Sequence, residues 1–212
     1  MKSLSRKACI RAIFTALLLC TPVFGNLATA SPLLSGDTPE VVVFFSYHCG
    51  ECQQLHAYTS AWAHLNPDVK VKRVPVFGNS QEGQWRFGAR LFFLLEQAQS
   101  KFPLSPFERQ QAAFNLTQQL DTFPTTAEGF ESLFRDYGME FSNIEFIQWW
   151  NKTEVMMISA RDVLSEVEKE TGGQRNVPFI RVSSKGKVNP TYIFKDDPVK
   201  MIQQINGVLH ED

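Results

Sequence analysis

The sequence predicts an α/β domain that is interrupted by an inserted block of helices. Three observations predict this fold class. A strand, a helix and a second strand succeed one another between residues 40 and 77, the strand signals stop from residue 80 to 171, and two strands and a final helix follow Gly172-Gly173. Strand, helix and strand in this order form a βαβ unit. Residues 31–79 and 172–212 are therefore predicted to form one domain, and residues 80–171 an inserted helical subdomain.

The βαβ unit is the clearest part of the pattern. The segment Glu40–Ser46 is a run of β-branched and aromatic residues, which is typical of a strand buried on both faces. The helix Gly50–Leu65 follows and is expected to end at Asn66-Pro67. Its apolar residues recur at spacings of three and four and predict one buried stripe: Leu55, Tyr58, Trp62 and Leu65. The second strand, Val69–Phe77, contains Pro75, which cannot donate a backbone hydrogen bond, so this strand is predicted at a sheet edge.

The remaining elements follow from the same periodicities. The inserted block is expected to contain five helices, with possible N-caps at Thr125, Thr126 and Asn143: Trp85–Gln99, Pro106–Gln119, Thr126–Asp136, Asn143–Trp150 and Glu154–Glu170. After Gly172-Gly173, the segments Phe179–Ser183 and Lys187–Phe194 predict a β-hairpin, and the apolar face of Pro198–Leu209 predicts a closing helix.

The N-terminus has the three parts of a secretory leader. Basic residues come first, the apolar run Ala12–Leu19 follows, and Ala28-Thr29-Ala30 supplies the small residues that precede a cleavage site. The apolar run is too short to span a bilayer. We therefore predict that residues 1–30 are a signal peptide and that Ser31–Asp212 is exported to the periplasm. The alternative is a lipoprotein signal ending at Cys20, although Leu19 is not the small residue expected before such a cysteine.

The charge of the exported part argues against one class of partner. The leader contains four of the 21 basic residues and none of the 22 acidic ones, which leaves 17 against 22 and a net charge of −5. Nucleic-acid binding requires a basic surface that neutralises phosphates. We therefore expect no nucleic-acid partner.

The cysteines point to redox chemistry. The sequence has four, and because Cys9 and Cys20 lie in the predicted leader, the exported protein keeps only Cys49 and Cys52. A disulfide that closes so short a ring adds little chain-entropy stabilisation, whereas structural disulfides of exported proteins close long loops. The pair is therefore predicted to be a reversible disulfide that needs no further cofactor.

The position of the pair assigns a role to each sulfur. Cys49-Gly50-Glu51-Cys52 lies between a buried strand and a helix, so Cys49 lies at the helix N-terminus, where unpaired N–H groups and the helix dipole favour a negative charge. That location lowers the pKa of a thiol, and the thiolate is the nucleophile. We expect Cys49 to be the exposed nucleophile and Cys52 the buried resolving thiol.

The sequence resembles the DsbA-type thiol:disulfide oxidoreductases. The resemblance rests on V-V-V-F-F-S-Y-H-C-G-E-C, on the helical insertion and on Val177-Pro178 before the terminal strands, and it covers nearly all of the exported chain. It implies a thioredoxin fold with a cis peptide at Val177–Pro178, which faces the cysteines and helps to hold substrate. It also implies a monomeric oxidase that acts on unfolded exported proteins with cysteines and is reoxidised by a quinone-linked, DsbB-like membrane partner.

Two departures from the family pattern concern the thiolate. Gly50-Glu51 replaces the Pro-His dipeptide whose histidine stabilises the thiolate in the resembled family, and Val43 replaces a buried acidic residue. The charge of Glu51 disfavours a thiolate on Cys49, although a protonated His48 would offset it. We therefore expect a higher Cys49 pKa and a less oxidising disulfide than in Pro-His members.

Three other functions remain open at this point. The acidic dipeptide would suit a disulfide reductase or isomerase that a membrane partner keeps reduced. A chaperone-like binding module would use a hydrophobic groove and leave the disulfide incidental. A metal-handling protein would use the ligand-like cluster His48, Cys49, Cys52 and His56. We expect no metal, because the two histidines flank a turn and a helix, and we expect His56 to be a solvated or hydrogen-bonded helix residue.

Overall fold

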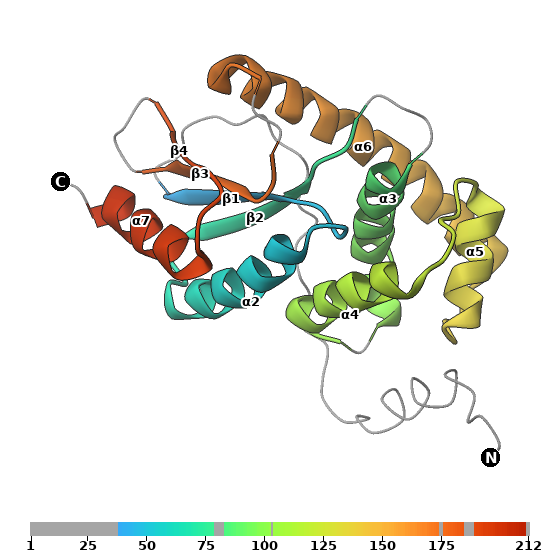
Figure 1. The fold of residues 1–212 in the computed structure, drawn as a ribbon. Coiled ribbons are helices and arrows are strands. Elements are labelled where there is room, and N and C mark those ends of the chain that lie inside the picture. The colour runs from blue at the N-terminus through green and yellow to red at the C-terminus, as the bar shows by residue number, and fades with distance from the viewer. Residues whose placement is uncertain (1–37, 79–82, 103, 174–175, 185–188, 211–212) are drawn as a thin grey trace.

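The computed structural model describes residues 38–78, 83–102, 104–173, 176–184 and 189–210 (Figure 1). The predicted signal peptide, residues 1–30, lies outside these ranges. The described residues form a mixed α/β structure in which one four-stranded sheet is surrounded by helices. No helix in these ranges is long and apolar enough to cross a membrane.

The sheet is built around the first strand. Its order is β2-β1-β3-β4, and the strands are β1 (Glu40–Phe45), β2 (Lys70–Pro75), β3 (Phe179–Ser183) and β4 (Thr191–Ile193). Strand β1 runs parallel to β2 and antiparallel to β3, which in turn pairs antiparallel with β4. The apolar run of β1 is buried on both faces, and β2 with Pro75 lies at the edge, as predicted.

Helices α2 (Gly50–Leu65) and α7 (Pro198–His210) cover one face of the sheet (Figure 1). Their apolar residues pack with alternate residues of β1 and β3: Val41, Val43, Leu55, Trp62, Ile180, Val182, Met201 and Ile205. Across the two helices the Trp62 indole N–H donates a hydrogen bond of 2.8 Å to the Asn206 side-chain oxygen. This face holds the helix that carries both cysteines.

The predicted apolar stripe of α2 is wrong in part. Leu55 and Trp62 are buried, but Tyr58 is 47% exposed and Leu65 is 77% exposed. Cys52, His56 and Thr59 are buried instead. The reason is that α2 packs against α4 as well as against the sheet, through hydrogen bonds such as that from the Gln53 amide to Asn115 (3.2 Å), so its buried face turns towards α4.

The helical subdomain begins after β2. It comprises the elements α3 (Gln84–Gln97), η1 (Gln99–Lys101), α4 (Pro106–Gln119), α5 (Ala127–Asp136) and α6 (Asn143–Thr171). Thr126 caps α5, as expected. The cap of α6 is Ser142 rather than Asn143, because Ser142 and Glu145 exchange the two hydrogen bonds of a capping box.

Helix α6 corrects a second prediction. The sequence suggested two helices, Asn143–Trp150 and Glu154–Glu170, but a single helix of 29 residues runs to Gly172, which ends it in a left-handed conformation (φ 68°). The polar run Asn151-Lys152-Thr153 contains neither proline nor glycine, and Thr153 is fully buried. The buried face of the helix therefore continues through this run.

The helical subdomain packs on the opposite face of the sheet through aromatic rings. The rings of Phe44 and Phe179 stack with centroids 4.3 Å apart, which joins β1 to β3 beneath the helices. The Phe45 ring meets Phe92 of α3 at 5.5 Å, and the Tyr47 ring meets Phe114 of α4 edge to face at 4.9 Å. These contacts fix the helices beside the end of β1, where the cysteines follow.

Candidate active site

Cys49 and Cys52 form a disulfide at the N-terminus of α2. Cys49 is the N-cap residue, with φ −109° and ψ 112°, and its Sγ accepts a hydrogen bond of 3.1 Å from the Cys52 backbone N–H. The Cys49 side chain is partly exposed, whereas Cys52 is only 2% exposed. An attacking thiolate therefore reaches Cys49 first, and an N–H group is in place to stabilise negative charge on its sulfur.

Val177 and Pro178 approach the disulfide from the far end of the sequence. Their peptide bond is cis, and they immediately precede β3. The Val177 carbonyl oxygen lies 3.7 Å from Cys49 Sγ. Because β3 is paired with β1, the sheet brings the loop before β3 next to the turn after β1. The structure thus places the predicted residues Cys49, Cys52, Val177 and Pro178 together.

Glu51 is paired with a lysine that the sequence did not indicate. Its Oε1 lies 2.7 Å from Nζ of Lys195, in the loop between β4 and α7, and its Oε2 lies 3.7 Å from Cys49 Sγ. The pKa of Glu51 is lowered, chiefly because the Lys195 ammonium donates a hydrogen bond to the carboxylate. The negative charge beside Cys49 is thus partly balanced by a cation. No signal near Lys195 in the sequence reveals this contact.

His48 does not supply the positive charge that the sequence analysis allowed. Its ring meets Phe123 edge to face at 4.8 Å and lies 6.4 Å from Phe87. Burial lowers its pKa, and a backbone hydrogen bond with Gln84 opposes that shift only in part. The imidazole is therefore neutral at neutral pH and does not offset the charge of Glu51.

His56 is hydrogen-bonded, which is one of the two alternatives expected for it, and it is buried rather than solvated. It is only 4% exposed, its ring stacks on Phe107 at 4.9 Å, and Nε2 lies 3.3 Å from the Phe107 carbonyl oxygen. The pKa of His56 is lowered to about 4, chiefly by burial and next by the charge of Arg73, while the hydrogen bond with the Phe107 carbonyl opposes the shift. A neutral imidazole thus lies one helical turn below Cys52.

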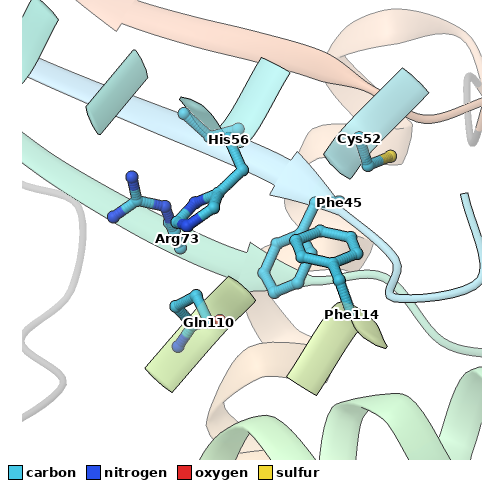
Figure 2. Close-up of a pocket in the computed structure, with 7 residues that line it drawn as sticks. Phe45, Cys52, His56, Arg73, Gln110 and Phe114 are labelled. Atoms are coloured by element: carbon cyan, nitrogen blue, oxygen red, sulfur yellow. The ribbon is translucent and has the colours of Figure 1, made fainter. Parts of the chain in front are cut away.

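A small pocket lies beside Cys52 (Figure 2). Side chains from β1, β2, α2 and α4 line it: Val43, Phe45, Cys52, His56, Arg73, Gln110 and Phe114. It has room for about one water molecule. Val43 leaves the wall without the carboxylate of the resembled family, and Arg73, whose Nη2 donates a 2.8 Å hydrogen bond to Ser60, provides a positive charge instead.

The buried imidazole makes stability depend on pH. The folded-state pKa of His56 is about 4, below the 6.5 of an exposed histidine, so the unfolded chain binds the proton first as pH falls. The contribution is full above about pH 6.5 and is lost as pH falls towards 4. Between pH 7 and 4.5, the free energy of unfolding of the wild type should fall by about 2 kcal/mol more than that of His56→Gln. Urea titration at the two pH values measures the difference. The exposed His64→Gln is the control; an unchanged pH slope in His56→Gln would contradict the assignment.

The described residues do not form the metal cluster considered above. Within the ranges that the structure describes, no group of three or more His, Cys, Asp and Glu side chains is arranged to hold a metal ion. The two histidines of the motif point to different aromatic partners, His48 to Phe123 and His56 to Phe107. Their imidazoles are engaged in packing on either side of the disulfide.

Comparison with known proteins identifies the fold. No protein-family model and no curated protein sequence matches the chain. Solved structures do match: DsbA of Pseudomonas aeruginosa (TM-score 0.62, 19% identity, 85% of this chain and 86% of that one) and oxidoreductase DsbA from Xylella fastidiosa (0.60, 18%, 84% and 86%). The oxidoreductase NmDsbA1 from N. meningitidis is similar (0.59, 18%, 86% and 87%). The chain therefore has the DsbA-type fold, a thioredoxin fold with a helical insertion, as the sequence predicted.

Proposed function

We propose that this protein is a periplasmic thiol–disulfide oxidoreductase that introduces disulfides into exported proteins. One observation carries the proposal: a reachable sulfur at the first turn of a helix is bonded to a buried sulfur three residues later. A substrate thiolate can attack such a disulfide only at the exposed sulfur, and the disulfide is reduced by two electrons in the exchange. The DsbA-type fold supports this reading, and the leader-like N-terminus supports the location.

The reaction proceeds by two thiol–disulfide exchanges. A substrate thiolate attacks Cys49 Sγ, the Cys49–Cys52 bond breaks, and Cys52 leaves as a thiolate that takes up a proton. A second substrate thiolate attacks the substrate sulfur of the mixed disulfide, and Cys49 leaves as a thiolate. Two electrons have then passed to the protein, and a quinone-linked, DsbB-like membrane partner would remove them to restore the disulfide.

The surroundings of Cys49 support its role as a leaving thiolate. The Cys52 N–H, 3.1 Å from Cys49 Sγ, stabilises the Cys49 thiolate. The carbonyl of Val177, 3.7 Å from Cys49, is an acceptor for the backbone of an extended substrate. Unfolded proteins present such extended segments, so we propose unfolded exported proteins as the substrates. We also propose that the protein acts as a monomer.

The structure also offers one reason to consider the reductive direction. Glu51 places a carboxylate oxygen 3.7 Å from Cys49 Sγ, which disfavours the thiolate and makes a disulfide harder to reduce. A reductase or isomerase would be kept reduced by a membrane partner. Alkylation of free thiols in intact cells separates the two directions: an oxidase holds Cys49 and Cys52 mostly as the disulfide, and a reductase holds them mostly as thiols.

Trapping of mixed disulfides tests the proposal. In Cys52→Ala the resolving sulfur is missing, so substrates attached to Cys49 accumulate. We expect this variant, expressed with its leader, to form several covalent adducts in the periplasm that reducing agent releases. The double variant Cys49→Ala/Cys52→Ala should form none. Equal adducts in both variants, or none in Cys52→Ala, would refute exchange through Cys49.

A further inference from the structure

We propose that Lys195 is a positioning residue that tunes the redox equilibrium of the active disulfide by holding Glu51 in an ion pair beside Cys49. This inference rests on the proposed function and adds to it a residue that lies 144 positions from Glu51 in the sequence. Lys195 does not contact a reacting sulfur in the described contacts. It acts through the carboxylate that does.

The carboxylate of Glu51 lies between a cation and a sulfur. Its Oε1 accepts a hydrogen bond of 2.7 Å from Lys195 Nζ, and its Oε2 lies 3.7 Å from Cys49 Sγ. One oxygen of the carboxylate thus contacts the Lys195 ammonium, and the other lies near the Cys49 sulfur. Lys195 follows β4, which is paired with β3, and Glu51 is in the first turn of α2. The fold, rather than local sequence, creates this arrangement.

The ion pair changes what Glu51 does to the thiolate. An unpaired carboxylate this close to Cys49 repels a thiolate, raises its pKa and favours the disulfide. With Lys195 bound, the carboxylate and the ammonium together carry no net charge, so part of the repulsion is removed. The reduced form is then stabilised relative to a protein that has Glu51 alone. Both side chains are about half exposed, 52% for Glu51 and 50% for Lys195, so water and salt weaken the effect without removing it.

The other charged groups near the motif do not replace Lys195. On the loop before the helix, burial lowers the pKa of His48, which is neutral. On the loop before α7, Asp196 lies 3.7 Å from Lys200 Nζ, and Asp197 accepts hydrogen bonds from the N–H groups of Val199 and Lys200. From the loop before β3, Val177 presents a neutral carbonyl. In the part of the chain that the structure describes, Lys195 is the cation paired with Glu51.

A double-mutant cycle tests this role. The measured quantities are the Cys49 pKa, from the ultraviolet absorbance of the thiolate, and the equilibrium constant with glutathione, for wild type, Lys195→Met, Glu51→Gln and the double variant. We expect Lys195→Met to raise the Cys49 pKa by about 0.5 to 1 unit and to make the disulfide about three- to tenfold harder to reduce. The same substitution should have a smaller effect in the Glu51→Gln background and at high salt.

Two control variants make the result specific. Lys200→Met removes a lysine of the same loop–helix region and should leave the Cys49 pKa unchanged, and Lys195→Arg should retain most of the wild-type value. Equal shifts with and without Glu51, or a Lys195→Met shift no larger than that of Lys200→Met, would overturn the proposal. If wild type itself did not exchange with glutathione, the proposed function would fail, whereas the pKa cycle would still report on the ion pair.

Discussion

Replacing Cys49 by serine is expected to reduce catalysed disulfide exchange to the background rate of the reagents. A serine oxygen neither forms a disulfide nor ionises at neutral pH, and Cys52, only 2% exposed, is out of reach of a protein substrate. The measurement is the oxidative refolding of a reduced, unfolded protein in a glutathione buffer, with wild type and Cys49→Ser at equal concentration. The loss should be complete within the sensitivity of the assay.

The matched control for this experiment is Cys52→Ser. It keeps the reachable sulfur of Cys49, so it should still form mixed disulfides with the substrate while turnover is lost. Full activity of Cys49→Ser would contradict the account. It would favour the chaperone-like binding module, in which the disulfide has no part in function.

Replacing Phe114 by alanine is expected to lower the free energy of unfolding by about 3 to 5 kcal/mol. This α4 side chain is 1% exposed and joins the helical subdomain to the sheet domain. Its ring lies 4.9 Å from Tyr47, 6.1 Å from Phe45 and 5.8 Å from His56. Truncation would leave a cavity next to the pocket beside Cys52. Denaturant unfolding of the oxidised protein measures the loss.

Phe107 of the same helix provides the comparison. It is 41% exposed and contacts His56 from the outer side, so Phe107→Ala should cost about 1 kcal/mol or less. Equal losses of unfolding free energy in the two variants would contradict a central role of Phe114 in joining the helical subdomain to the sheet. Fluorescence and circular dichroism should give one coincident transition for wild type, because the two parts share one aromatic core.

The parts of the fold that the sequence predicted are those with strong local signals. The apolar run of β1 is buried on both faces whatever surrounds it, and Pro75 excludes β2 from the sheet interior by its missing N–H group. The Cys49–Cys52 spacing at a strand-to-helix junction likewise depends only on neighbouring residues. These features follow from backbone chemistry within one supersecondary unit.

The parts that were missed depend on contacts between distant segments. Nothing in the sequence of α2 shows that α4 covers it, so the sequence left open whether His56 is solvated or hydrogen-bonded, and it wrongly predicted that Tyr58 is buried. The pair of Glu51 and Lys195 forms only when β4 has joined the sheet. The sequence predicted two helices in place of α6 because the polar residues Asn151-Lys152-Thr153 are typical of a break between helices. Tertiary packing nevertheless buries Thr153. In each case tertiary contacts, rather than local sequence preferences, determine the structure.

Titration of the Cys49 thiolate in the reduced wild-type protein tests the central claim most directly. The claim is that the first turn of α2, whose Cys52 N–H donates a hydrogen bond to Cys49 Sγ, stabilises a negative charge on this sulfur. The account predicts a thiolate pKa below the value of about 8.5 for a free cysteine. The same chain unfolded in denaturant should return to that value. A folded-state pKa at or above about 8.5 would contradict the claim.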